Sequence, residues 1–318
     1  VNGLFLSKGY MSGSVTRLER YQQCPFKFYA QYGLKLEPRP VRSFGAPEIG
    51  TFLHANLERL GNYLLENNKQ WRDLDEEEQE NLCRAVADEI LQENQMGEET
   101  SDAYQKAIEQ RVQRTLHVTV DRLVEWSKRS DFDTKYLEQD FGRQGGWDPI
   151  RVSLGEDRYL RLIGQIDRID EYTRDGQTYG MVIDYKSGGA HVTAQDVYYG
   201  LKLQLMTYLL ALESAYGKTH GESMSPAAVV YSYVKNPADA PISYEDAVSL
   251  ANESDAWQNS GYFSDDIELL THIDNKFLSY GSKRGPYVPI ATKKDQTISS
   301  RDLRKVKSTG EFDVMCRY

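Results

Sequence analysis

The sequence predicts an α/β fold in which a mixed β-sheet is flanked by helices and preceded by a helical region. Up to about residue 132, apolar residues recur at helical spacing, and from about residue 134 short apolar runs have the character of strands. A further helical pattern and a further strand follow these runs, an order typical of an α/β or α+β core. We therefore expect a helical region over residues 1–132 and a sheet-containing core over residues 133–318.

Four helices are expected in the first region. They cover residues 16–33, 47–68, 73–94 and 101–130. Ser14 or Thr16 is placed to cap the first helix, and Thr16 and Glu19 have the spacing of a capping box. Pro25 lies inside this pattern and predicts a kink or two separate helices, because proline cannot donate the helical hydrogen bond.

The core is expected to hold five strands and one long helix. The strands cover residues 135–142, 150–155, 158–172, 179–188 and 227–236, and the helix covers residues 194–217. Asp175 and Gly176 predict a tight turn between the third and fourth strands. The chain ends inside a helical pattern, so we expect it to be part of a longer protein with a truncated C-terminus.

Composition narrows the possible functions. The formal net charge of −10 lacks the basic character of a module that simply coats nucleic acid, although an enzyme that handles DNA in one local groove remains possible. Three scattered cysteines and the lack of a long apolar run predict a cytoplasmic protein without disulfides or a membrane segment. The sequence has no phosphate-binding loop of the type used by ATPases.

An acid and a lysine stand at the end of a strongly apolar strand. Asp184 and Lys186 are two positions apart, so both side chains are expected on one face of the sheet. Asp167 ends an apolar stretch in the preceding strand and can lie beside Asp184. Neighbouring carboxylates repel unless a cation lies between them, and their oxygens suit Mg²⁺ or Mn²⁺. This set predicts metal-assisted phosphodiester hydrolysis, with the lysine offsetting charge on the phosphate.

Other polar residues can complete such a site. His54 and Glu58 lie one turn apart on a predicted helix, and Gln204 and Tyr208 share a face of another. Each has a simpler interpretation: His54 as a buried core residue, and Tyr208 as a packing residue on a leucine-rich helix. Asp184 and Lys186 alone could also form an ordinary surface ion pair.

The ordered set of these motifs resembles the RecB-type branch of the PD-(D/E)xK nucleases. The motifs are Gly50-x-x-x-His54, Gly164-x-Ile166-Asp167, Ile183-Asp184-Tyr185-Lys186 and Gln204-x-x-x-Tyr208. The segment SVTRLERYQQCPFKFYAQYG, residues 14–33, further resembles the start of the nuclease domain in the AddB family of helicase–nuclease subunits. The resemblance implies a restriction-endonuclease-like fold and a divalent-metal-dependent exodeoxyribonuclease. Such an enzyme processes double-strand DNA ends for recombinational repair, together with the A-type subunit of the helicase–nuclease.

The resemblance also implies a role for each motif residue. His54, Asp167, Asp184 and the backbone carbonyl of Tyr185 would bind Mg²⁺ or Mn²⁺. Lys186 would be the catalytic cation, acting with Asp167 and Asp184. Gln204 and Tyr208 would organise the site or contact DNA.

A [4Fe-4S] cluster is the second cofactor that the resemblance implies. Cys24 would match the first of four cysteine ligands, and the other three would lie near the C-terminus. Cys316 either begins that C-terminal set or belongs to the helix that precedes it, and the flanking residues favour the helix. Because the sequence holds three cysteines, a complete four-cysteine cluster cannot form from this chain alone.

Two other functions are compatible with these residues. A nuclease fold without catalysis could act as a DNA-binding or scaffold module, although the complete set of Asp167, Asp184 and Lys186 argues against it. A hydrolase of small phosphorylated molecules is disfavoured by the missing glycine-rich phosphate loop.

Overall fold

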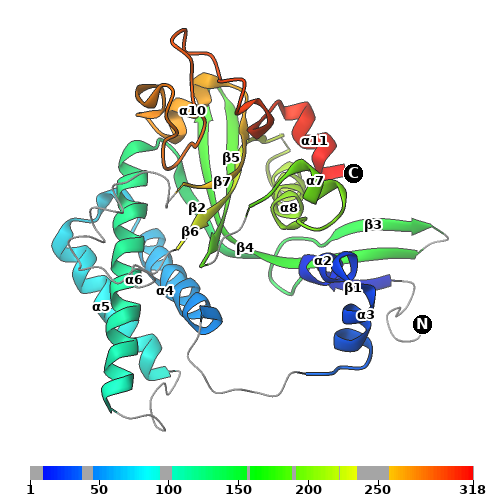
Figure 1. The fold of residues 1–318 in the computed structure, drawn as a ribbon, viewed down its shortest axis with the longest axis horizontal. Coiled ribbons are helices and arrows are strands. Elements are labelled where there is room, and N and C mark those ends of the chain that lie inside the picture. The colour runs from blue at the N-terminus through cyan, green and yellow to red at the C-terminus, as the bar shows by residue number, and fades with distance from the viewer. Residues whose placement is uncertain are drawn as a thin grey trace.

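The computed structural model describes residues 10–37, 46–93, 102–155, 158–187, 191–221, 223–234 and 258–317. In these residues one eight-stranded mixed sheet lies between two groups of helices (Figure 1). Helices α4, α5 and α6 cover one face of the sheet, and α7, α8 and α11 cover the other. The predicted α/β fold with a restriction-endonuclease-like mixed sheet is confirmed.

The long strand β4 organises the sheet. The strands are β1 (Tyr10–Ser14), β2 (Asp133–Phe141), β3 (Ile150–Gly155), β4 (Arg158–Arg174), β5 (Gln177–Lys186), β6 (Ser225–Tyr233), β7 (Ser260–Ser264) and β8 (Val306–Lys307). The first half of β4 pairs with β1 and β3, and its second half pairs with β2 and β5. Strand β5 then pairs in parallel with β6, and β7 and β8 follow. Strands β1, β7 and β8 were not predicted from the sequence.

The turn between β4 and β5 has the predicted position. Asp175 has φ 52° and Gly176 has φ 80°, the left-handed conformations that a two-residue hairpin turn of type I′ requires. The turn fixes the register of the hairpin and places Arg168 opposite Ile183. Asp167 and Asp184, the next residues along each strand, are thereby brought to neighbouring positions.

The first predicted helix is divided at Pro25. Helix α2 covers Val15–Gln23, α3 covers Pro25–Phe28, and a π-helical turn covers Tyr29–Gly33. Ser14 is the cap, accepting a hydrogen bond from the Arg17 N–H at 3.4 Å. The predicted capping box of Thr16 and Glu19 is wrong, because the Glu19 carboxylate instead accepts hydrogen bonds from the start of α8.

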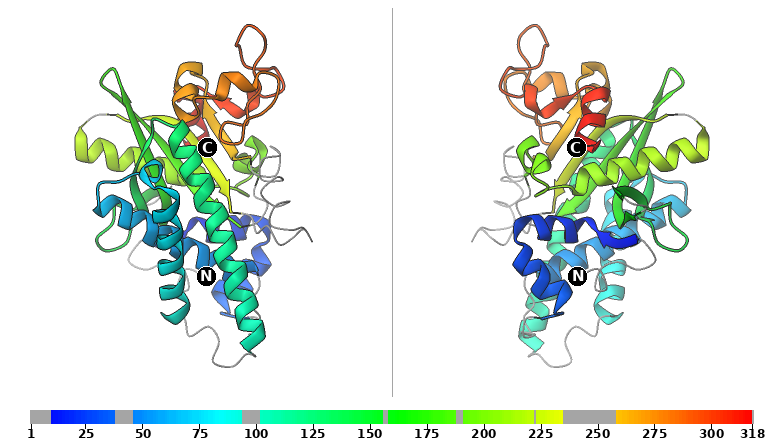
Figure 2. Two further views of the ribbon diagram at one scale, coloured as in Figure 1. Left: turned by 90° about the vertical axis from the view of Figure 1, so that its left-hand side faces the viewer. Right: turned by 90° about the vertical axis from the view of Figure 1, so that its right-hand side faces the viewer.

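The next three helices confirm the periodicity of the sequence. They are α4 (Ala46–Glu66), α5 (Glu76–Glu93) and α6 (Asp102–Arg129), with a short 3-10 turn at Trp71–Asp73 between α4 and α5. Their apolar stripes form one core with the sheet, as the buried Leu53, Leu57 and Leu60 of α4 show. Figure 2 shows α6 running along one side of the sheet and α8 along the opposite side.

The helix predicted over residues 194–217 is wrong in one respect, because it is two helices. Helix α7 covers Ala194–Tyr198 and α8 covers Gln204–His220. Gly200, with φ 70°, lies between them in a conformation that other residues rarely adopt. Gln204 is therefore the first residue of α8, and not a residue in the middle of a long helix.

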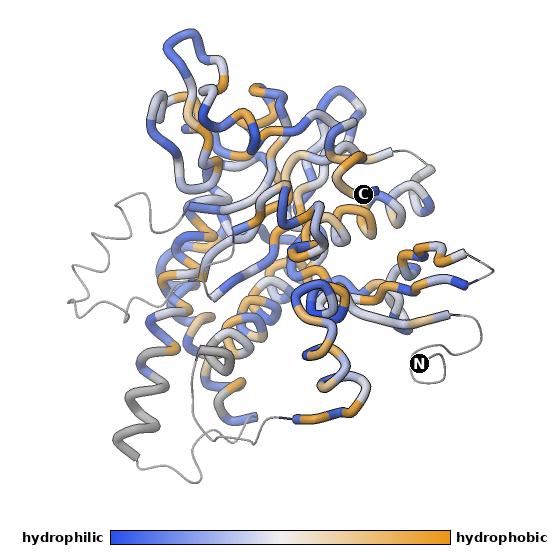
Figure 3. Tube along the Cα trace, turned by 45° about the vertical axis from the view of Figure 1, so that its right-hand side comes forward, coloured by the Kyte–Doolittle hydropathy of each residue, from blue (hydrophilic) through white to orange (hydrophobic). Residues whose placement is uncertain are grey.

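The remaining elements add to the cores on both faces of the sheet. They are α10 (Ile267–Ile273), 3-10 turns at Phe277–Tyr280 and Leu303–Lys305, and α11 (Thr309–Arg317). Hydrophobic residues gather along the strands and the inward faces of the helices, as Figure 3 shows. Of the predicted strand residues, 188, 235 and 236 lie outside the described residues. None of the described helices has the length and apolar character needed to span a membrane.

Candidate active site

Asp184 and Lys186 lie at the end of β5, where α8 covers the sheet. The Asp184 side chain is fully buried, whereas 29% of the Lys186 side chain is exposed. The Lys186 Nζ atom lies 2.5 Å from Asp184 Oδ2. The two side chains therefore meet on one face of the strand, as their spacing predicts, and the lysine remains accessible from outside.

Asp167 joins this pair from the neighbouring strand β4. Its Oδ2 atom accepts a hydrogen bond from the backbone N–H of Tyr185 at 2.8 Å. The same oxygen lies 3.4 Å from His54 Nδ1. The other ring nitrogen of His54, Nε2, is 3.0 Å from the Tyr185 carbonyl oxygen. All four groups that the resemblance assigns to the metal thus come from three separate elements and converge at the end of β5.

Helix α4 can deliver His54 because it approaches the end of β5 closely. Gly50 lies one helical turn before His54, and a Cβ atom at this position would be 3.0 Å from Ser187 Oγ. A side chain there would push the helix away from the strand. The glycine in the motif Gly50-x-x-x-His54 therefore has a steric reason.

Glu138 of β2 is a further acid at this site that the sequence analysis did not find. Its Oε1 atom lies 3.9 Å from His54 Nδ1. His54, Glu138 and Asp167 each offer one ligand atom within 4.8 Å of the others. Glu138 has φ 44°, an unusual conformation for a residue other than glycine. Only the pairing of β2 with β4 reveals this acid, whereas Glu58 is not part of this group in the described residues.

Gln204 and Tyr208 are brought to the site by the first turn of α8. The Gln204 Nε2 amide donates to Asp184 Oδ1 at 2.7 Å and to the Tyr208 hydroxyl at 2.9 Å. Tyr208 is itself buried and packs edge-on against Phe141. Gln204 thus holds one oxygen of Asp184 while Lys186 contacts the other.

Burial and mutual repulsion set the protonation of the acids. Burial raises the pKa of Asp184, and the nearby Asp167 carboxylate raises it further, while Lys186 opposes the increase. Burial likewise raises the pKa of Asp167. Burial acts to lower the pKa of His54, but the carboxylates of Glu138 and Asp167 outweigh it and raise that pKa to about 9. The cluster concentrates negative charge that a cation would neutralise.

The donor set fits a divalent cation. Asp167 and Asp184 offer carboxylate oxygens, Tyr185 offers a carbonyl oxygen, and His54 offers an imidazole nitrogen. Hard oxygen ligands with one nitrogen suit Mg²⁺ or Mn²⁺ better than a thiophilic metal. These residues could therefore hold such an ion, and Glu138 could add a further oxygen.

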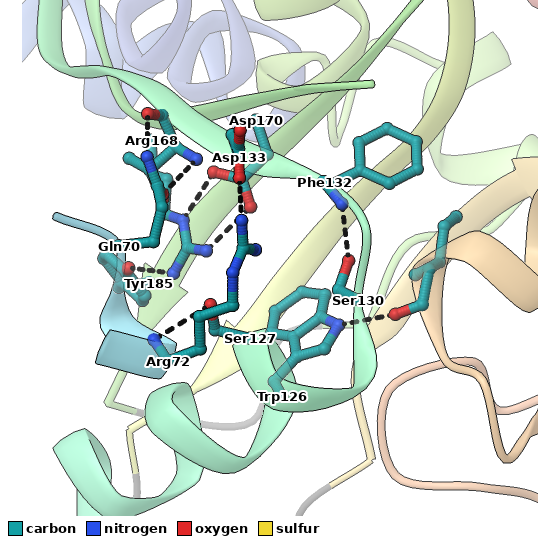
Figure 4. Close-up of polar contacts among 12 residues, drawn as sticks. Gln70, Arg72, Trp126, Ser127, Ser130, Phe132, Asp133, Arg168, Asp170 and Tyr185 are labelled. Atoms are coloured by element: carbon teal, nitrogen blue, oxygen red, sulfur yellow. Dashed lines mark hydrogen bonds and ion pairs between the residues drawn. The ribbon is translucent and has the colours of Figure 1, made fainter. Parts of the chain in front are cut away.

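Arg168 supports the strand end from the opposite face of the sheet. Its guanidinium makes two hydrogen bonds of 2.7 Å to the Asp170 carboxylate, and both residues are buried (Figure 4). It also donates to the Tyr185 hydroxyl at 3.4 Å and lies over the rings of Trp71 and Trp126. The side chain of Tyr185 is thus fixed in the core while its backbone faces His54 and Asp167.

The three cysteines are all unpaired. Cys24 lies at the end of α2, and Cys316 lies inside α11 with its thiol 3.5 Å from the Met206 carbonyl oxygen. Burial, with Glu213 and Asp313 nearby, raises the pKa of the Cys316 thiol to about 12. In the part of the chain that the structure describes, neither Cys24 nor Cys316 belongs to a group of three or more potential metal ligands.

The mixed sheet and the acids and lysine at the end of β5 define the class of protein as an α/β nuclease. Residues 12–276 match the PD-(D/E)XK nuclease superfamily, and the chain belongs to that family. Nucleases of this superfamily generally depend on a divalent metal.

Curated relatives support the same family. The chain is 34% identical over 268 residues to an ATP-dependent helicase/deoxyribonuclease subunit of the AddB type from Ruminiclostridium cellulolyticum, which is 82% of this chain and 23% of the relative. It is 32% identical over 287 residues to a protein of the same name in Clostridioides difficile, 90% of this chain and 25% of the relative. The chain spans about a quarter of the length of these relatives.

Proposed function

We propose that this chain is a divalent-metal-dependent exodeoxyribonuclease. It would serve as the nuclease domain of a helicase–nuclease that processes double-strand DNA ends for recombinational repair. The observation that carries the proposal is the convergence of Asp167, Asp184 and Lys186 with His54 at the end of β5. The names of the relatives, which combine helicase and deoxyribonuclease, support the wider context.

In this proposal His54, Asp167, Asp184 and the Tyr185 carbonyl hold Mg²⁺ or Mn²⁺. When bound, the ion supplies a Lewis acid that lowers the pKa of a water molecule and offsets charge on the phosphate. Lys186 is partly exposed and lies at the rim of the acids, where it can position that water and contact a phosphate oxygen.

Gln204 and Tyr208 have an orienting role in the proposal. The Gln204 amide fixes one oxygen of the buried Asp184, so the other oxygen stays directed toward Lys186. Tyr208 fixes Gln204 in turn through its hydroxyl. Contact of either residue with DNA remains a prediction from the resemblance.

The partners and the second cofactor are proposals for the longer protein. DNA is the substrate, and the names of the relatives support the A-type subunit of a helicase–nuclease as the partner. A [4Fe-4S] cluster would use Cys24 and needs ligands beyond the three cysteines of this chain. A cytoplasmic location also remains a prediction, based on the scattered, unpaired cysteines.

Cleavage of end-labelled single-stranded DNA tests the proposal. The chain is expected to cut with Mg²⁺ or Mn²⁺, and Lys186→Ala is expected to lower the rate at least about 100-fold, as the loss of a charge-stabilising group does. Lys218→Ala is the matched control, because Lys218 forms an exposed ion pair with Asp148 on the far end of α8. Metal-dependent cutting that survives Lys186→Ala or Asp184→Ala would contradict the assignment. Metal binding without cutting would instead indicate an inactive scaffold.

A further inference from the structure

Helix α8 begins with a cap that comes from a distant part of the chain. Its N-cap residue, Leu203, has no side chain that can accept a hydrogen bond from the helix. The Glu19 carboxylate of α2 instead accepts hydrogen bonds from the N–H groups of Leu203 and Gln204, at 2.7 and 3.2 Å. Glu19 thereby satisfies backbone donors that every helix leaves unpaired at its start.

This acid is held at an electrostatic cost. Burial raises the pKa of Glu19, while the two backbone hydrogen bonds and the positive charges of Lys202 and Lys186 lower it. A carboxylate at a helix N-terminus also interacts favourably with the helix dipole. A half-buried acid whose hydrogen bonds are spent on another element indicates a specific function for that contact.

The capped residue is also the residue that orients the acid of the site. Gln204 is the first residue of α8, and its side chain donates to Asp184 Oδ1 at 2.7 Å. Asp184 in turn contacts Lys186. A continuous series of hydrogen bonds and ion pairs thus runs from α2 through the start of α8 to the predicted catalytic lysine.

The segment before α8 cannot fix this position alone. Gly200, with φ 70°, interrupts the chain between α7 and α8. The N–H groups of Leu201 and Lys202 turn back to the Asp196 carbonyl in α7 and not toward α8. The register of the first turn of α8 therefore depends on the contact with Glu19.

We propose that Glu19 is a positioning residue that anchors the first turn of α8 and thereby holds the Gln204 amide on Asp184. The role in catalysis rests on the proposed nuclease function. The anchoring of α8 does not, because it concerns the backbone alone. The two parts can be tested separately on the full chain.

Amide hydrogen exchange tests the anchor without any need for activity. Glu19→Met removes both acceptor oxygens, and we expect exchange at the first turn of α8 to become about five- to tenfold faster, the change that a lost helix cap produces. Glu19→Gln keeps one acceptor oxygen and should retain slow exchange. Gln23→Met, an exposed position on the same helix, controls for general loosening of α2. Unchanged exchange in Glu19→Met would overturn the anchor.

A double-mutant cycle with Gln204→Met tests the positioning role. We expect Glu19→Met to lower kcat between about 10- and 100-fold at constant KM, as a misplaced catalytic group does. The double variant should be no slower than Gln204→Met alone, since both changes remove one contact. Glu19→Gln should restore most of kcat. Multiplying losses, or a kcat equal to that of the wild type, would overturn the positioning role. A wild type with slow exchange that cuts no DNA would refute the nuclease and leave the anchor supported.

Discussion

Removal of Asp170 should destabilise the protein strongly, because its partner Arg168 would become an unpaired buried charge. The two side chains are 2% and 4% exposed and share two hydrogen bonds of 2.7 Å. After Asp170→Ala, the guanidinium would keep one hydroxyl at 3.4 Å and the faces of two tryptophan rings. Breaking such a pair from one side costs about 3–5 kcal/mol, a large part of the 5–15 kcal/mol that stabilises an ordinary domain.

Urea unfolding followed by circular dichroism measures this cost through the midpoint and the slope. The double variant Arg168→Met, Asp170→Leu is expected to lose less stability than Asp170→Ala, since it leaves no buried charge. Asp148→Ala, which breaks an exposed ion pair, should change stability by less than about 1 kcal/mol. A cost below about 1 kcal/mol for Asp170→Ala, or a double variant that is less stable than it, would refute the reasoning.

Three further outcomes are expected. Glu138→Gln should weaken Mn²⁺ binding, measured by calorimetry, by about tenfold, and an unchanged affinity would exclude Glu138 from the site. Glu213→Gln should flatten the pH profile of stability: burial raises the pKa of Glu213 from 4.5 to about 7, so the folded protein holds that proton and loses stability as the pH rises between these values. Gly50→Ala should weaken Mn²⁺ binding by pushing α4 away from Ser187, and Ser187→Gly should restore it, whereas failure of this rescue would place the effect elsewhere.

Local patterns explain why much of the fold could be predicted from the sequence. Helices α4, α5 and α6 follow apolar stripes with helical spacing, and the β4–β5 hairpin follows the Asp175-Gly176 turn. Both signals lie within one segment of the chain. By contrast, β1, β7 and β8 cover five, five and two residues, too few for an alternating pattern to stand out. The break at Gly200 was missed because apolar residues continue across it.

The candidate site divides in the same way. Asp167, Asp184 and Lys186 could be predicted because they end apolar strands, and buried strands seldom carry charges without a reason. Glu138 and Glu19 could not, because each acts through a partner far along the chain. Glu138 meets His54 only through the pairing of β2 with β4, and Glu19 meets α8 across 184 residues.

Tyr185 explains why the scaffold and the site should respond to the same mutations. Its side chain lies on the face of Arg168, whereas the neighbouring Asp184 and Lys186 point to the opposite face. Its backbone belongs to neither face: the N–H binds Asp167 and the carbonyl contacts His54. A shift of the tyrosine ring in its core pocket therefore moves two backbone groups of the site at once. We expect Asp170→Ala to weaken Mn²⁺ binding even under conditions where the protein stays folded, and Mn²⁺ calorimetry below the unfolding transition checks this; an affinity equal to that of the wild type would show that the strand end is held without Arg168.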